Sequence, residues 1–257
     1  MLIDTHAHLD HVENLDEALA QAVAAGVTEI VAVSMDLASM QKSLEIKNNF
    51  FSPQIYLGLG IHPGNIKTEE IEEALDFLKS HMGQAQVVGE IGLDFWYKWV
   101  RQDAEKKKQQ RDVFRRQLVL AKEHNRPVVV HARGTWRECF ETVREVGIQS
   151  AVFHWYSGPV DVMQDIVSAG YFVSTTPSLA YSPQSQEAIR HAPIESTLIE
   201  TDSPVFYRYD ASREDGFKSQ PKDVVRTLQI YARYKGLAEE KAAQILNANA
   251  HRFLGIG

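Results

Sequence analysis

Short runs of apolar and β-branched residues alternate along the chain with longer segments in which apolar residues recur at helical spacing. The short runs predict eight strands: Leu2–Thr5, Val27–Val33, Gln54–Gly60, Gln86–Ile91, Pro127–Val130, Ala151–Phe153, Tyr171–Ser174 and Ser196–Thr201. Strands that are separated by helices from one end of a chain to the other usually pair in parallel. The pattern therefore predicts an α/β fold built on a parallel sheet.

The segments between these strands have the periodicity of amphipathic helices. The helices are expected over Leu15–Ala25, Leu37–Asn48, Glu69–His81, Phe114–His124, Cys139–Val146, Val160–Ala169, Lys222–Tyr234 and Glu239–Phe253. The eight strands, the 257 residues and the buried character of the strands fit a (β/α)8 TIM barrel that forms a single domain over residues 1–257. An open, doubly wound sheet is the alternative fold.

Composition places the chain among ordinary globular proteins, with 44% hydrophobic and 24% charged residues. We expect a cytoplasmic protein without a membrane segment, because no apolar run approaches the roughly 18 residues that a membrane span requires. Cys139 is the only cysteine, so an internal disulfide is excluded. The net charge of −7 argues against a generally basic, nucleic-acid-coating surface. It does not exclude phosphate substrates, since bound divalent ions attract phosphate even in an acidic cleft.

The barrel prediction places the active site at the C-terminal ends of the strands. Polar residues that could bind a metal or act in catalysis lie at or after these ends: His6, His8, His62, Glu90, Asp94, His131, Arg133, His154 and Asp202. The remaining histidines fall in loops or helices, where we expect surface or local hydrogen-bonding roles: His11, His81, His124, His191 and His251. The functional residues are therefore expected to converge from distant parts of the chain.

Six of these side chains form a candidate metal centre: His6, His8, Glu90, His131, His154 and Asp202. Nitrogen and oxygen donors without thiolates suit Zn, Mn, Mg, Ni or Fe, and six ligands fit two divalent ions better than one. We expect Glu90 to bridge the two ions. Asp202 would bind one ion and accept the proton of a water that the ions convert to a metal-bound hydroxide. Asp4 is expected to orient a ligand, and the role of Glu200 stays open.

Seven short motifs follow one another from end to end of the chain. They are Asp4-Thr5-His6-Ala7-His8-Leu9, Gly60-Ile61-His62-Pro63, Gly89-Glu90-Ile91-Gly92-Leu93-Asp94, Pro127-Val128-Val129-Val130-His131-Ala132-Arg133, Phe153-His154-Trp155-Tyr156-Ser157-Gly158, Glu200-Thr201-Asp202-Ser203-Pro204 and Asn249-Ala250-His251-Arg252-Phe253. In this order they resemble the TatD family of metal-dependent hydrolases, which are (β/α)8 members of the wider amidohydrolase group.

The resemblance implies a binuclear divalent-metal centre and metal-dependent DNase activity, often as a 3′ to 5′ exonuclease on single strands. It implies the same six ligands and places His62 near the substrate phosphate. Related amidohydrolases often carry a carbamylated lysine where this chain has Glu90, which favours the TatD branch. The chain departs from the usual pattern at Ala132-Arg133-Gly134, Trp155-Tyr156 and Lys218-Ser219-Gln220-Pro221. These departures affect the choice of substrate rather than the proposed ligands.

Loops after the expected strands are rich in aromatic residues on which unpaired bases could stack: Phe95, Trp96, Tyr97, Trp99, Trp155, Tyr156, Phe206, Tyr207 and Tyr209. A basic run follows the fourth strand and could contact a phosphate backbone: Lys98, Arg101, Lys106, Lys107, Lys108, Arg111, Arg115 and Arg116. His62, Asp94 and Arg133 are the expected substrate-binding residues. Packing of the aromatic rings under their loops, and solvation of the charged helix start, are the alternative interpretations.

Three functions are compatible with these residues. The first is a phosphodiesterase that cleaves single-stranded DNA or another phosphodiester, as a 3′ to 5′ deoxyribonuclease. The second is a metallohydrolase for an ester or amide carbonyl, such as that of a D-aminoacyl-tRNA, which the same ligands could polarise. The third is a noncatalytic binding barrel, which the presence of all six ligands disfavours. We expect no obligate protein partner.

Overall fold

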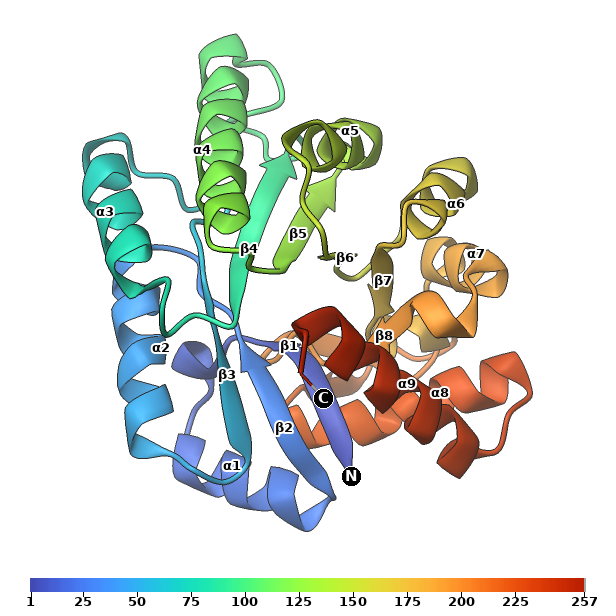
Figure 1. Cartoon of the computed structure of the whole chain (residues 1–257). Coiled ribbons are helices and arrows are strands. Elements are labelled where there is room, and N and C mark those ends of the chain that lie inside the picture. The colour runs from blue at the N-terminus through green and yellow to red at the C-terminus, as the bar shows by residue number, and fades with distance from the viewer. Residues whose placement is uncertain (257) are drawn as a thin grey trace.

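The computed structural model describes residues 1–256 and forms a parallel eight-stranded barrel (Figure 1). Its strands lie in chain order: β1 (Leu2–Ala7), β2 (Val27–Ala32), β3 (Gln54–Leu59), β4 (Val87–Asp94), β5 (Val128–Arg133), β6 (Ala151–Phe153), β7 (Phe172–Thr175) and β8 (Thr197–Ile199). Each strand pairs in parallel with the next. The TIM-barrel prediction is confirmed, and the doubly wound sheet is excluded.

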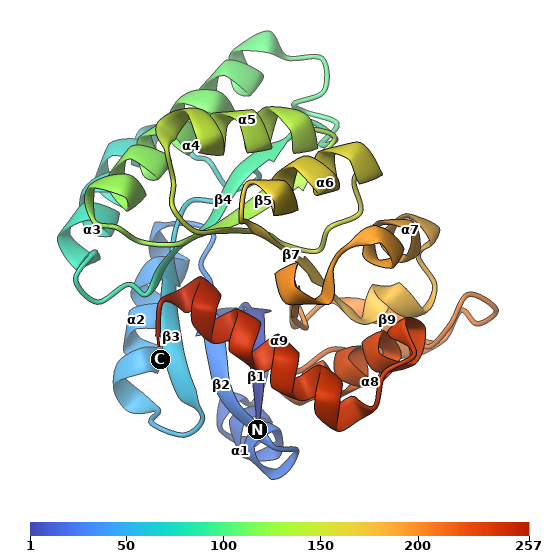
Figure 2. The same cartoon turned by 45° about the vertical axis from the view of Figure 1, so that its right-hand side comes forward.

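Helices follow the strands and surround the barrel (Figures 1 and 2). They are α1 (Leu15–Ala24), α2 (Leu37–Asn49), α3 (Ile71–His81), α4 (Ala104–Glu123), α5 (Trp136–Val146), α6 (Val160–Ser168), α7 (Pro183–His191), α8 (Val224–Lys235) and α9 (Glu239–Leu254). Sequence periodicity did not predict α7, because only two of its side chains are apolar. Its start is nevertheless marked, since Ser182 caps the helix and Pro183 occupies its first position.

Several boundaries differ from the sequence-based expectation in ways that bear on the site. β4 and β5 extend further than predicted, so Asp94, His131 and Arg133 lie within these strands rather than after them. α4 begins ten residues before the predicted Phe114. The long loop after β8 contains an antiparallel hairpin, formed by β9 (Phe206–Arg208) and β10 (Gly216–Lys218).

The N-terminal ends of the strands are covered by the last helix. Phe253 and Leu254 of α9 pack against apolar side chains inside the barrel. Gln86 and Ser150, which lie just before β4 and β6, donate hydrogen bonds to the carbonyls of Leu254 and Phe253. With this end covered, the C-terminal ends of the strands remain for a site.

The barrel closes between β1 and the segment that follows β8. The backbone N–H of Asp202 donates to the carbonyl of His6 at 2.9 Å. The Asp4 carboxylate accepts hydrogen bonds from the Thr201 N–H at 2.9 Å and from its hydroxyl at 2.6 Å. These contacts extend the pairing beyond the short strand β8 and hold His6 beside Asp202.

In residues 1–256, no helix combines the length and the apolar character that crossing a membrane would require.

The close pairing of β4 with β5 generates a stability prediction at Gly92. A Cβ atom on Gly92 would lie 1.9 Å from the His131 carbonyl oxygen, and the φ of +151° disfavours any other residue. We expect Gly92→Ala to lower the free energy of unfolding by about 2–5 kcal/mol, measured by urea titration with circular dichroism. The control is Gly83→Ala, whose Cβ meets nothing within 4 Å. Equal stability of the two variants would contradict the account.

Candidate active site

A cleft of about 1750 Å³ opens at the C-terminal ends of the strands. Its floor includes five of the six candidate ligands: His8, Glu90, His131, His154 and Asp202. The sixth, His6, is fully buried beneath them. These residues therefore lie together in the structure, as the sequence predicted. Their roles remain a prediction.

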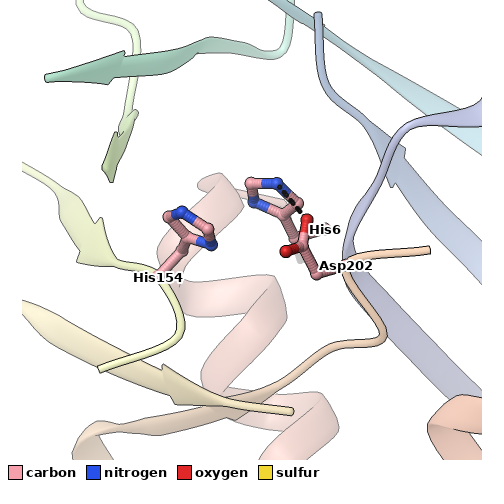
Figure 3. A group of neighbouring side chains, drawn as sticks. All are labelled: His6, His154 and Asp202. Carbon is pink, nitrogen blue, oxygen red and sulfur yellow. Dashed lines mark ion pairs between the residues drawn. The ribbon is translucent and has the colours of Figure 1, made fainter. Parts of the chain in front are cut away.

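One half of the site brings together two histidines of the β1 end and two carboxylates. The Nε2 atoms of His6 and His8 lie 3.4 Å apart. Each lies 3.5 Å from Glu90 Oε2, and they lie 3.3 and 3.4 Å from Asp202 Oδ1. Figure 3 shows His6 beside Asp202, with His154 approaching from the other side.

The other half of the site is formed around the second oxygen of Glu90. Glu90 Oε1 lies 2.8 Å from His131 Nδ1 and 2.7 Å from His154 Nε2. These two imidazole nitrogens are 3.3 Å apart. His62 Nε2 lies 3.7 Å from the same oxygen. The two oxygens of Glu90 thus face different histidines.

Neighbouring carboxylates contact the outward nitrogens of two of these imidazoles. Asp94 Oδ2 lies 3.0 Å from His131 Nε2 and accepts a hydrogen bond from Arg133 Nε at 2.8 Å. Glu200 Oε1 lies 3.3 Å from His154 Nδ1. Such contacts fix the orientation of an imidazole and the nitrogen that faces the site. The structure thus places Glu200, whose role the sequence left open, in contact with His154.

Two residues beside the site adopt left-handed backbone conformations. Trp155, which follows His154, has a φ of +41°, and Asp202 has a φ of +47°. Asp tolerates this region, but for a bulky residue such as Trp it is an outlier that needs support from its surroundings. The Trp155 N–H donates to Ser174 Oγ and to Glu200 Oε1, which supplies that support.

Burial and opposite charges shift the pKa values of the site in opposing directions. Burial disfavours protonation of His8, but hydrogen bonds to Asp202 and Glu90 prevail and raise its pKa to about 10. Burial favours the neutral form of Asp202, yet His6 and His8 hold the pKa of its carboxyl well below its usual range. Burial lowers the pKa of His62 to about 3, so this imidazole is neutral.

The donor set fits divalent cations. Two pairs of imidazole nitrogens face each other at 3.3–3.4 Å, which is unfavourable for lone pairs unless a proton or a cation lies between them. Three overlapping groups hold their donor atoms within 4.8 Å: His6, His154 and Asp202; His6, His8 and Glu90; and His62, Glu90 and His131. The buried Nδ1 atoms of His6 and His8 have no hydrogen-bond partner among residues 1–256.

All nine residues singled out from the sequence lie at this site. Arg133 lies at the rim, with 48% of its side chain exposed. Sequence reasoning missed part of the cleft wall. His11 is half exposed, as expected for a surface residue, but the sequence did not show that its ring lines the cleft, 6.1 Å from that of His8. Trp136 and Tyr181 also line the cleft, and no motif in the sequence marks them.

Comparison with known proteins agrees with this geometry. A family described as TatD related DNase matches residues 3–255. The chain is 30% identical to the human deoxyribonuclease TATDN3, with 97% of this chain and 93% of the relative covered. It is 29% identical to an uncharacterized metal-dependent hydrolase of Methanocaldococcus jannaschii, with 98% of this chain and 96% of the relative covered.

Among solved structures, the TatD homologue YjjV from Escherichia coli superimposes with a TM-score of 0.86 at 24% identity. The match covers 100% of this chain and 98% of that structure, which supports the barrel fold over the whole length. Taken with the family match over residues 3–255, these findings show that the chain belongs to the TatD family of metal-dependent hydrolases.

Proposed function

We propose that this hydrolase is a divalent-metal-dependent deoxyribonuclease that removes nucleotides from single-stranded DNA in the 3′ to 5′ direction. The observation that carries the proposal is the placement of Glu90, whose two oxygens face different pairs of histidines. A shared carboxylate of this kind suits a pair of ions, which is a common arrangement in enzymes that cleave phosphodiesters. The DNase description of the family and the name of the human relative support DNA as the substrate.

We assign His6, His8 and Asp202 to one ion and His131 and His154 to the second, with Glu90 shared between them. Mg, Mn, Zn, Ni and Fe are all compatible with these nitrogen and oxygen donors. When bound, the ions would neutralise the charge of the phosphate and lower the pKa of water toward about 7.

Asp202 is assigned as the proton acceptor for the attacking water. Its carboxyl is buried, and contacts with His6 and His8 keep it ionised. An ionised carboxylate at this position has the capacity to take the proton and to hold the water in place. Asp202 would thus both bind an ion and take part in catalysis.

His62 and Arg133 are assigned to the substrate phosphate. The Gly64 N–H donates to His62 Nδ1 at 3.0 Å, so the neutral ring carries its proton on Nε2, which faces the site. Arg133 uses its Nε to bind Asp94 and lines the cleft with the rest of its guanidinium group. Both side chains therefore offer N–H donors to phosphate oxygens.

The first prediction concerns the metals. We expect elemental analysis of the purified protein to find two divalent ions per chain, and Glu90→Gln to lose at least one of them. Nuclease kcat should fall by about 100-fold or more in Glu90→Gln and in Asp202→Asn, because each change removes a charge from the proposed centre. Glu240→Gln, on the exposed start of α9, is the matched control and should behave as wild type. The assignment would be refuted if either site variant kept full activity. It would also be refuted if the wild-type enzyme kept full activity after a chelator had removed its metal.

The second prediction concerns the substrate. We expect a 5′-labelled single-stranded oligonucleotide to shorten progressively from its 3′ end in the presence of added metal. An aminoacyl ester tests the alternative carbonyl substrate under the same conditions, because the same ligands can polarise a carbonyl. Turnover of the ester with no shortening of the oligonucleotide would replace the deoxyribonuclease proposal by the carbonyl hydrolase.

A further inference from the structure

A line of stacked side chains leads from the candidate metal centre to the molecular surface. Asp94 contacts His131 and binds the guanidinium group of Arg133. The guanidinium carbon of Arg133 lies 4.8 Å from the centre of the Tyr97 ring. Tyr97 in turn stacks on Trp99, with ring centres 4.2 Å apart and planes at 22°. Trp99 is 49% exposed, so the line ends in solvent.

A second exposed tryptophan lies at the mouth of the cleft. Trp96 is 66% exposed and lines the cleft. A Cβ atom on Gly134 would lie 2.4 Å from the Trp96 indole, so the glycine directly after β5 leaves room for this ring. Two indoles three residues apart are thus held open to solvent beside the site, rather than folded under their loop as the alternative interpretation required.

The same segment is positively charged within an acidic protein. Residues 95–108 contain five lysine and arginine side chains and two carboxylates, whereas the whole chain has a net charge of −7. Four of these cations are exposed and form no ion pair with residues 1–256: Lys98, Arg101, Lys106 and Lys108. They are therefore free to meet an anionic ligand.

The basic run that the sequence suggested as a phosphate track divides into two parts. Arg111, Arg115 and Arg116, further along α4, pair with carboxylates of the neighbouring helices α5 and α3. These arginines serve helix packing. Only the part before Arg111, close to the cleft, remains available for a ligand.

We propose that residues 95–108, here called the aromatic–basic rim, bind the unpaired nucleotides on the 5′ side of the bond that is cleaved. Bases would stack on Trp96 and Trp99, and the exposed cations would contact the phosphates between them. Arg133 joins the rim to the centre, so the strand reaches the catalytic groups from this side. The inference rests on the proposed nuclease function and names the part of the molecule that selects single strands.

Charge and ring exposure together favour single-stranded nucleic acid over other occupants. In a duplex the base faces are already stacked, so they cannot reach the indoles, whereas every unpaired base offers a free face. A second copy of this acidic chain would also complement the basic charge of the rim. Binding of a second copy would not explain why the rim is continuous with the cleft. The test therefore includes the oligomeric state.

The experiment measures binding of a fluorescent 12-nucleotide single strand to the metal-loaded wild-type protein and its rim variants. The strand carries phosphorothioate linkages, which resist cleavage, so that binding is measured without turnover. We expect Trp96→Ala and Trp99→Ala each to raise Kd by about tenfold, because base stacking on an aromatic ring contributes roughly this factor or more. Trp→Phe at both positions keeps the rings and should restore most of the affinity. The control is Phe51→Ala, which removes a ring that is 83% exposed in the turn before β3, away from the cleft.

Two further measurements separate this inference from the proposed function. In the otherwise active enzyme, Trp96→Ala/Trp99→Ala should lower kcat/KM for the 12-nucleotide strand at least tenfold relative to kcat/KM for methyl p-nitrophenyl phosphate. This small diester is too short to reach the rim. The dependence of log Kd on log salt should become shallower by about 1.4 in Lys98→Gln/Arg101→Gln, since two phosphate contacts are lost.

An unchanged Kd in Trp96→Ala/Trp99→Ala would overturn the inference, as would an equal loss in Phe51→Ala. Dimerisation of the wild-type protein that the double variant abolishes, without any change in DNA affinity, would assign the rim to a second copy instead. If wild-type enzyme cleaves neither the strand nor the small diester, the proposed function fails, and the binding measurement still decides the role of the rim.

Discussion

The hydrogen bonds that close the barrel between β1 and the segment after β8 are the constraint on which the site depends. They hold His6, near the end of the first strand, and His8, just after it, against Asp202 in the segment after β8. The Asp4 carboxylate secures this closure through two hydrogen bonds from Thr201. Burial raises the pKa of Asp4 to about 8, although the Thr201 hydrogen bonds oppose the rise. Closure of the fold and assembly of the site are therefore one event, because separating β1 from this segment would take the two histidines away from Asp202.

The closed barrel then concentrates groups that would repel one another without a counter-charge. Pairs of imidazole nitrogens face each other around Glu90, and both Glu90 and Asp202 are buried. Burying carboxylates is costly unless cations or hydrogen bonds compensate them. In the metal-free chain the nearby carboxylates raise the pKa values of His6, His8, His131 and His154, which favours protonated imidazoles as the compensating charge. Divalent ions would provide the compensation in the active enzyme. Metal binding is for this reason linked to proton release and to the stability of the closed barrel.

Much of this arrangement could be predicted from the sequence, because two strong physical rules apply. Buried parallel strands are short apolar runs, and barrel enzymes place their chemistry at the C-terminal strand ends, so His131 and Asp202 could be selected without coordinates. The polar helix α7 could not be found by periodicity, and the β4 and β5 ends were placed too early. The sequence also could not show which cations of the basic run form ion pairs within the protein. Whether Arg111 contacts Glu138 or a ligand depends on how α4 packs against α5.

Two of the three departures from the family pattern place residues in the wall of the cleft, namely Ala132-Arg133-Gly134 and Trp155. Trp155 is also connected to the candidate metal centre. Trp155 follows His154, and its indole N–H donates to Ser178 Oγ at 2.8 Å. Its backbone N–H donates to Glu200, the same carboxylate that contacts His154. Trp155, which shapes the wall, and His154, which faces the site, thus contact the same carboxylate of Glu200. A change of Trp155 would therefore be expected to alter the orientation of His154 as well as the shape of the cleft, because both residues contact Glu200.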